Sequence, residues 1–249
     1  LKGKKNGEII QVIDKGNQTT VISGSALDPD AKTFLTTFSI TDPTEISAID
    51  TLTKSLKVGS INGTDNWTNA KGIYPIMPTS LAASKGNLRN VSLNMLAVNG
   101  DAVLSAAGLA FNGSDTYDTQ INALNDLTLN SVTLATYFQD NVAGTISIGA
   151  TNGTSRLRIY PRFTNDIFYW DCYTTINGQL QAANTDDSGL MIATRTSATD
   201  FSVYRFTTSL GNKATGGGTP PNLTLGFAGH NDISTGFGNG LPNTYSFGY

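Results

Sequence analysis

The chain has 249 residues and a formal net charge of −3, from 16 Lys and Arg against 19 Asp and Glu. Apart from the "LKGKK" start its basic residues are scattered, which argues against nucleic-acid binding, because that activity needs clustered positive charge. Hydrophobic residues make up 39% of the chain and charged residues 14%, a composition that predicts a folded domain with a sizeable core.

One cysteine, Cys172, is present, so no intramolecular disulfide can form. A chain without disulfides fits assembly in a bacterial cytoplasm. No run of about 18 apolar residues occurs, and we therefore expect no membrane-spanning segment. The chain begins at Leu1 rather than Met, from which we expect the sequence to start partway into a longer protein.

Residues 1–40 are predicted to form an extended N-terminal arm. The runs "GEIIQVID", "TTVIS" and "KTFLTTFSI" are rich in β-branched and aromatic residues, as strands are. The turn-rich "SGSALDPDA" separates the last run from the other two.

Residues 41–60 contain the one convincing helical pattern, "TDPTEISAIDTLTKSLKVG". Thr41 or Asp42 can cap its start, Pro43 suits the first turn, and Gly59 ends it. Its apolar residues recur at three- and four-residue spacing and form one stripe: Ile46, Ile49, Leu52 and Leu56. The stripe predicts packing against the sheet that follows.

Residues 61–249 are predicted to form an all-β domain, an antiparallel β-sandwich. Turn signals such as Asn-Gly and Gly-Ser recur at short intervals, and many of the runs between them alternate apolar with polar residues. Helical connectors are missing, which excludes a parallel α/β fold and favours a sandwich or jelly roll. The runs are "VSLNMLAV", "SVTLATYFQ", "GTISIGA", "SRLRIYPRF", "DIFYWDCYT", "GLMIATRT", "FSVYRFTT", "NLTLGFAG" and "TYSFGY".

Several weak motifs follow the predicted helix in a definite order. Trp67, Lys71 and the pair Tyr74-Pro75 come first, and "KGNLRN" and "GLAFNGSDTYDTQIN" follow them. Further along, the turn Arg195-Thr196-Ser197 joins two strand-like runs, the second of which contains Tyr204. "NLTLGFAGHN" and "FGNGLPNTYSFGY" close the chain.

Over residues 44–249 these motifs resemble the concanavalin A-like (laminin G-like) jelly-roll domains found in virion proteins of Bacteroidota phages and prophages. The resemblance implies a subunit of the particle surface, as a fibre, spike or vertex-associated protein. It also implies other virion subunits as partners, a homo-oligomer with a trimer favoured, and recognition of host surface glycans. That group usually continues into an Asp-Gly loop and a closing helix, whereas this sequence stops at Tyr249. Residues 1–40 have no counterpart in the group, and the expected role of this arm is attachment to the virion.

The same sandwich also hosts retaining glycosidases, which need two carboxylates about 5 Å apart, usually on alternate residues of one strand. No such pair occurs in the sequence. Glu8 and Glu45 lie outside the predicted sandwich, and the adjacent Asp186 and Asp187 would point to opposite sides. His230 lacks the Gly-x-Ser-x-Gly elbow of a serine hydrolase. We therefore expect no catalytic residue and no enzymatic activity.

No cofactor is expected either. One histidine rules out a His-rich metal site. Calcium needs several oxygen ligands from neighbouring loops, and the candidates are Asp28–Asp30, Asp126 and Asp186–Asp187. Their spacing does not match a calcium loop, and aspartates in such turns more often bind backbone amides.

Aromatic side chains are the first candidates for ligand binding, because sugar sites often place an aromatic face under the sugar ring. Trp67 could present its ring to a ligand or hold the helix against the sandwich. Phe168, Tyr169, Trp170 and Tyr173 lie on one predicted strand and must fill both of its faces. Most of them belong to the core, and Tyr169 and Trp170 are the candidates to reach the solvent side.

A polar segment, His230, Asn231 and Asp232, is the second candidate. It is predicted to be a turn between two strand runs, and turn preference alone explains its composition. The functional alternative is a glycan or Ca²⁺ contact at the rim of the sandwich.

The sequence thus predicts a non-enzymatic phage virion surface protein with a lectin-like domain. A carbohydrate-binding module on a bacterial cell surface is the alternative, and it would need an export signal upstream of Leu1. A glycoside hydrolase is the remaining alternative, and only measured turnover of β-glucans would support it.

Overall fold

The computed structural model divides the chain into two compact units, Leu1–Asn69 and Ala70–Tyr249. The predicted arm and the predicted helix both fall in the first unit, and the second unit lies entirely within the predicted sandwich, whose residues 61–69 belong to the first unit. The residues that the structure describes are 3–5, 8–15, 18–22, 26–61, 64–144, 146–174, 178–214, 217–238 and 242–245.

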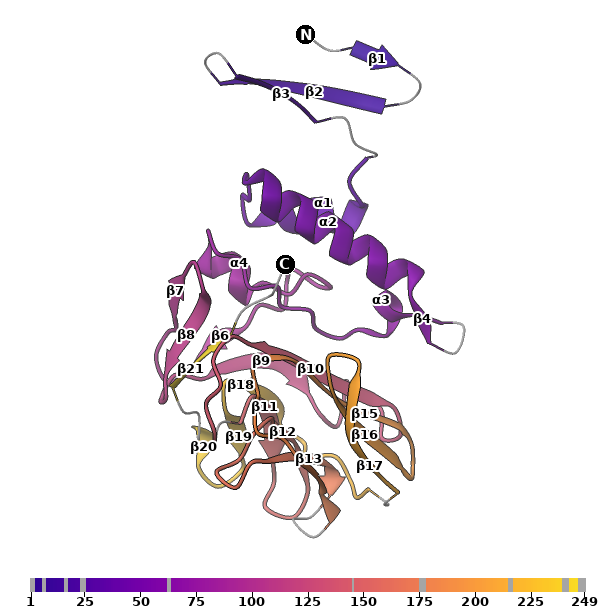
Figure 1. Ribbon diagram of the computed structural model, residues 1–249, viewed down its shortest axis with the longest axis vertical. Coiled ribbons are helices and arrows are strands. Elements are labelled where there is room, and N and C mark those ends of the chain that lie inside the picture. Colours follow the sequence, from indigo (N-terminus) through magenta and orange to yellow (C-terminus); the bar gives the residue numbers. More distant parts are fainter. Residues whose placement is uncertain are drawn as a thin grey trace. The chain divides into compact units, whose positions relative to one another are not determined.

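The first unit contains a three-stranded antiparallel sheet and two longer helices (Figure 1). Its strands β2 and β3 coincide with the runs "GEIIQVID" and "TTVIS", so both are extended as predicted. The elements are β1 (Gly3–Lys5), β2 (Glu8–Lys15), β3 (Gln18–Ile22), α1 (Pro29–Thr37), α2 (Pro43–Val58), β4 (Ser60–Ile61), β5 (Thr64–Asp65) and α3 (Asn66–Asn69).

The run "KTFLTTFSI" is largely helical, and the prediction of a strand there was wrong. The Asp28 side chain caps α1 by accepting a hydrogen bond from the Asp30 backbone N–H at 2.9 Å, and Pro29 occupies the first turn. The buried side chains recur at helical spacing: Ala31, Phe34 and Leu35. Capping and burial of one face therefore outweigh the strand preference of Thr and Phe.

Helix α2 begins and ends where the sequence predicts. Asp42 Oδ1 accepts hydrogen bonds from the backbone N–H groups of Thr44 at 2.9 Å and Glu45 at 3.0 Å. The backbone N–H of Gly59 donates to Ser55 at 2.9 Å and closes the last turn. Of the predicted apolar stripe, only Ile49 is fully buried.

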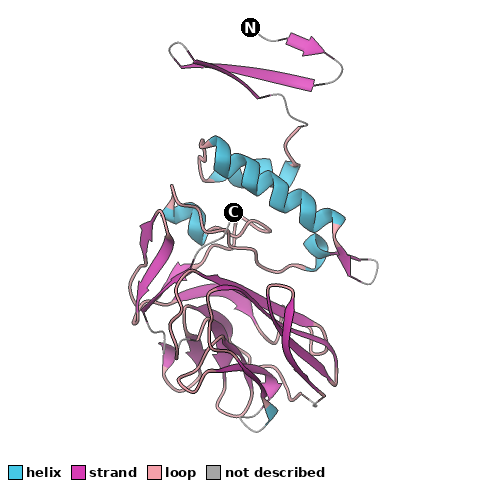
Figure 2. Ribbon diagram, viewed as in Figure 1, coloured by secondary structure: helices cyan, strands magenta, loops and turns pink. Residues whose placement is uncertain are grey.

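The second unit is an antiparallel β-sandwich, as the sequence predicts (Figures 1 and 2). Most of its strands match the predicted runs, whereas the last run continues beyond Tyr245 into residues outside the described ones. The elements are α4 (Leu81–Lys85), β6 (Leu96–Ala97), β7 (Val103–Ser105), β8 (Gly108–Asn112), β9 (Tyr117–Asn122), β10 (Val132–Phe138), β11 (Ile148–Thr151), β12 (Arg156–Tyr160), β13 (Ile167–Thr174), β14 (Leu180–Ala183), β15 (Gly189–Ser197), β16 (Asp200–Arg205), β17 (Thr208–Lys213), β18 (Thr224–Phe227), β19 (His230–Asp232), β20 (Gly236–Gly238) and β21 (Pro242–Tyr245).

Two sheets make up the sandwich. One has the strand order β17-β16-β15-β10-β21-β8-β7, and the other has the order β14-β13-β12-β11-β18-β9-β6, with β19 joined to it at β11. The chain passes repeatedly from one sheet to the other, as in jelly rolls. Strand pairs are antiparallel throughout the described residues, except for β11 with β19.

The hydrophobic core lies between the two sheets. On β13 and β15 alternate residues point inward, so that Phe168, Trp170, Met191 and Ala193 are fully buried. Cys172 is buried among them as a free thiol. Within the part of the chain that the structure describes, no helix is long and apolar enough to span a membrane.

Candidate functional site

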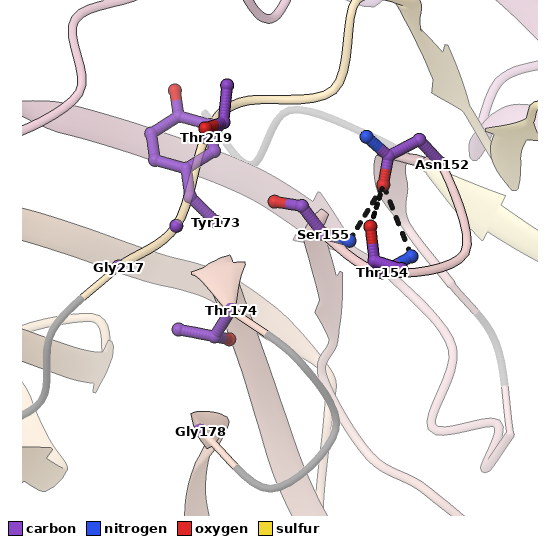
Figure 3. Close-up of a pocket in the computed structure, with 9 residues that line it drawn as sticks. Asn152, Thr154, Ser155, Tyr173, Thr174, Gly178, Gly217 and Thr219 are labelled. Carbon is purple, nitrogen blue, oxygen red and sulfur yellow. Dashed lines mark hydrogen bonds between the residues drawn. The ribbon is translucent and has the colours of Figure 1, made fainter.

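A pocket of about 550 Å³ lies in the sandwich unit, at the C-terminal end of β13. Three segments that are far apart in the sequence surround it (Figure 3). No lining residue that the structure describes carries a formal charge at neutral pH, and most are hydroxyl, amide or glycine residues. The lining residues are Asn152, Thr154, Ser155, Tyr173, Thr174, Gly178, Gly217, Gly218 and Thr219.

Tyr173 reaches the pocket through a β-bulge. Arg156 of β12 is opposite Thr174, while the next residue, Leu157, is opposite Cys172, so Tyr173 has no partner in the ladder. Its φ of 58° lies in the left-handed region, which is strained for a large side chain. Bulges often redirect a side chain next to a functional site, and this bulge sets Tyr173 apart from the regular alternation of β13.

Three hydroxyl groups of the lining have no hydrogen-bond partner among the described residues: Tyr173 OH, Thr174 Oγ1 and Ser155 Oγ. Their residues are 0%, 4% and 7% exposed. A buried hydroxyl without a partner costs about 1–3 kcal/mol. Three such groups belong to residues that line one pocket, which makes them candidates to bind a polar ligand.

The turn after β11 has a rigid geometry. Asn152 Oδ1 accepts hydrogen bonds from the backbone N–H of Ser155 at 2.7 Å and from the N–H and hydroxyl of Thr154, both at 3.2 Å (Figure 3). The Asn152 backbone N–H donates to Ser155 O at 3.1 Å. These bonds fix the position of Ser155 at the pocket wall.

Glycine lets the segment after β17 approach the end of β13. The Gly218 backbone N–H donates a hydrogen bond to Tyr173 O. A Cβ at Gly218 would lie 3.0 Å from the same oxygen, which is tighter than ordinary van der Waals contact. A larger residue here would push the segment away and change the pocket.

Burial raises the pKa of Tyr173 well above its usual value, and the neighbouring Arg195 charge offsets only part of this effect. The phenol is therefore protonated at neutral pH and can donate a hydrogen bond. No other described lining residue is ionisable. The pocket can bind a polar group, but its own lining offers no general base at neutral pH.

The predicted polar turn at His230 is a strand, β19, which corrects the prediction of a loop. His230 is 3% exposed, and Asn231 is 8% exposed with its Nδ2 donating to Thr224 Oγ1 at 3.3 Å. Asp232 is half-buried and accepts a hydrogen bond from the Ser234 backbone N–H at 2.7 Å. None of the three lines the pocket, and their predicted ligand role stays a prediction.

The two aromatic candidates on β13 point to opposite faces of the strand. Trp170 is fully buried in the core, so its ring presents no surface to a ligand in this structure. Tyr169 is half-buried and packs edge-on against Tyr160 and Phe163, with ring centroids 6.4 and 5.5 Å away. Asn165 Nδ2 donates to the Tyr169 hydroxyl at 2.9 Å. This cluster is separate from the pocket lining.

Trp67 lies on α3 in the first unit and is 5% exposed. Lys57 Nζ of α2 lies 5.1 Å from the centroid of its ring, within the range of a cation–π contact. The indole is thus packed against α2 rather than displayed as a flat platform. Its predicted ligand role is not tested by this packing.

Three of the aspartates considered as calcium ligands, Asp28, Asp126 and Asp186, have other partners, whereas the buried carboxylate of Asp187 has no hydrogen-bond partner among the described residues. Asp28 caps α1 and pairs with Lys57 at 2.7 Å, and Asp126 accepts a hydrogen bond from the Asn122 backbone N–H at 2.7 Å. Asp186 pairs with Arg205 at 2.5 Å. Over the described ranges, no group of three or more His, Cys, Asp or Glu residues could hold a metal ion.

Comparisons with known proteins add little to this geometry. No protein-family model and no curated protein matches the sequence. Among solved structures, the chain is similar to domain 4 of AbnA, a GH43 extracellular arabinanase from Geobacillus stearothermophilus, in complex with arabinotriose. The match has 11% sequence identity and a TM-score of 0.33, and covers 62% of this chain and 77% of that chain. At this TM-score the likeness carries no argument about ligand or function.

Sequence reasoning missed the pocket because its residues are ordinary in their local context. The sequence pattern predicts Ser155 and Thr174 to be polar residues at strand ends, and Tyr173 to be an aromatic residue of the core. The one local signal is the glycine run within "TGGGTPP", residues 215–221, since such a run permits close backbone approach. The glycine run alone does not show that the segment it approaches is the end of β13.

Proposed function

We propose that the β-sandwich is a non-enzymatic binding domain for a ligand rich in hydroxyl groups, such as a surface glycan. One observation carries this proposal: three residues that line one pocket, Tyr173, Thr174 and Ser155, have buried hydroxyls without a hydrogen-bond partner among the described residues. Sugar hydroxyls both donate and accept hydrogen bonds, so one sugar unit could pair with all three.

The size and composition of the pocket support binding. Its volume of about 550 Å³ lies in the usual range for small-ligand pockets, about 300–1,000 Å³. The described lining contains no carboxylate, imidazole or thiol, the groups that supply most acid–base and nucleophilic catalysis. The proposal is therefore recognition without turnover.

We extend the proposal to display on a phage particle, as a trimeric fibre, spike or vertex-associated subunit that contacts the host. The support for this part is the sequence resemblance alone, through motifs such as Trp67, Arg195-Thr196-Ser197 and Tyr204. Mass spectrometry of washed particles and the oligomeric state of the purified protein test it. A stable monomer that is absent from particles would contradict it.

The binding test uses the purified chain on a glycan array, followed by titration of the best ligands. Tyr173→Phe and Thr174→Val each remove one hydroxyl at nearly constant volume. Each is expected to weaken binding about fivefold, corresponding to about 1 kcal/mol for one hydrogen bond. Tyr137→Phe and Thr133→Val on β10 make the same chemical changes outside the pocket and should leave affinity unchanged.

Tyr169→Ala distinguishes the pocket from the aromatic cluster of Tyr160, Phe163 and Tyr169. If the pocket binds the ligand, this variant keeps wild-type affinity. Loss of binding in Tyr169→Ala together with full binding in Tyr173→Phe and Thr174→Val would overturn the assignment to the pocket.

A further inference from the structure

Arg195 on β15 is a buried cation, 2% exposed to solvent. Its Nε donates to Ser197 O at 3.0 Å, and one terminal nitrogen, NH2, donates to Asn130 Oδ1 and Ala198 O, both at 3.1 Å. All three acceptors are neutral. The other terminal nitrogen, NH1, is buried without a hydrogen-bond partner among the described residues.

The positive charge of Arg195 has no ion-pair partner among the described Asp and Glu residues. By contrast, Arg205 on the neighbouring strand β16 pairs with Asp186, and Arg158 of the other sheet pairs with Asp171. Two ionisable groups lie next to Arg195, Cys172 and Tyr173, and burial raises the pKa of both further above neutral, so neither supplies a negative charge at pH 7. Stacking on Phe201, with its ring centroid 4.9 Å from the guanidinium carbon, is attractive but leaves the net charge in place.

The guanidinium lies directly behind the pocket wall. A Cβ built on Gly217, a lining residue, would fall 2.1 Å from Arg195 NH1 and 2.8 Å from the guanidinium carbon. The ring centroid of Tyr173, a second lining residue, is 5.9 Å from that carbon. The charge of Arg195 therefore lies close to two residues that line the pocket, Gly217 and Tyr173.

We propose that the ligand of this pocket is an acidic sugar, whose carboxylate balances the charge of Arg195. This inference rests on the proposed function and specifies its ligand class. A charge acts strongly across a short distance in a poorly solvated region, and the unpaired hydroxyls of Tyr173, Thr174 and Ser155 can all donate to a carboxylate. The described lining contains no carboxylate that would repel the ligand.

The first test needs no variant. Methyl glycosides of glucuronate, galacturonate and N-acetylneuraminate are titrated into the wild-type chain beside their methyl esters, which keep the shape and remove the charge. At least one acid is expected to bind tenfold or more tightly than its ester. Equal affinity for acid and ester would overturn this inference and leave the proposed function standing. No binding by this panel or by a neutral glycan array would overturn both.

The second test removes or keeps the positive charge at position 195. Arg195→Met keeps the length of an unbranched side chain and should reduce acid binding to the level of the ester, whereas Arg195→Lys should keep a preference for the acid. Arg205→Met, on β16, removes a guanidinium that already has Asp186 as partner and should leave the acid-to-ester ratio unchanged. A purely structural role for Arg195 would lower both affinities together and would overturn the inference.

Discussion

Arg158 Nε donates a hydrogen bond to Asp171 Oδ2 over 2.6 Å, across the neighbouring strands β12 and β13. The Asp171 side chain is fully buried, and that of Arg158 is 12% exposed. Burial raises the pKa of Asp171, and the charge and hydrogen bond of Arg158 act in the opposite direction. The guanidinium thus offsets much of the cost of placing a carboxylate inside the fold.

Removal of this partner is expected to destabilise the sandwich. Arg158→Met leaves the Asp171 carboxylate buried without a cation, so the free energy of unfolding at pH 7 should fall by about 3 kcal/mol. Arg205→Met is the control, because Arg205 pairs with Asp186, whose side chain is 37% exposed, and such pairs contribute about 1 kcal/mol or less. Urea denaturation of both variants measures the difference, and equal losses would contradict the prediction.

His230 is expected to make the protein sensitive to acid. Burial and, to a smaller extent, the charge of Arg158 lower its pKa, and Asp232 opposes them, so that the pKa falls from 6.5 to about 4. Below pH 6.5 the unfolded chain takes up the proton first, so stability falls as the pH falls from 6.5 towards 4, by about 3 kcal/mol for this group. His230→Gln should remove that part of the slope in urea denaturation between pH 7 and pH 4. Parallel curves for the two proteins would contradict the assignment.

The sequence predicts those elements whose signals are local. Asp42, Pro43 and Gly59 mark the ends of α2 because caps and turns are determined by a few adjacent residues. Alternation of apolar and polar residues likewise predicts strands such as β10 and β12, whose alternate residues are buried. The helix α1 was missed although Asp28 and Pro29 supply a capping signal, because the Thr and Phe content of the run favoured a strand.

The candidate site depends on pairing between distant segments, which a single sequence does not determine. The bulge at Tyr173 exists only because Arg156 and Leu157 pair with residues that are two apart. Similarly, His230 and Asp232 read as a turn by composition but become a strand through pairing with β11 and β20. Register and bulges therefore have to come from the structure.

Asp187 is expected to lower the stability of the protein as the pH rises, whereas His230 lowers it as the pH falls. Asp187 is fully buried, and burial raises its pKa from 3.8 to about 6, while backbone N–H groups and Arg162 oppose the shift. Because the pKa of Asp187 is higher in the folded chain than in the unfolded one, the contribution of this group to stability is greatest below pH 3.8. That contribution is lost as the pH rises from 3.8 through 6. Asp187→Asn should therefore increase the free energy of unfolding at pH 7, by up to about 3 kcal/mol, and change it little at pH 4. A loss of stability at pH 7 would show that the carboxylate is needed in its charged form.

The Tyr173 hydroxyl is expected to lower the stability of the ligand-free protein and to increase its affinity for the ligand. The group is buried without a partner among the described residues, so Tyr173→Phe should raise the free energy of unfolding of the ligand-free protein by about 1 kcal/mol. Tyr117→Phe is the matched control. The Tyr117 hydroxyl donates to Asp101 and accepts from the Ala102 backbone N–H at 2.9 Å, so its loss should cost about 1–2 kcal/mol.

Urea denaturation of the ligand-free variants, beside the glycan titrations, compares these effects. Unpaired hydroxyls that serve to bind a ligand make the ligand-free protein less stable. Tyr173→Phe should therefore be more stable than the wild type and should bind the ligand less tightly. If Tyr173→Phe is instead as destabilised as Tyr117→Phe, the hydroxyl has a partner within the protein. The argument for a ligand at this pocket would then lose its main support.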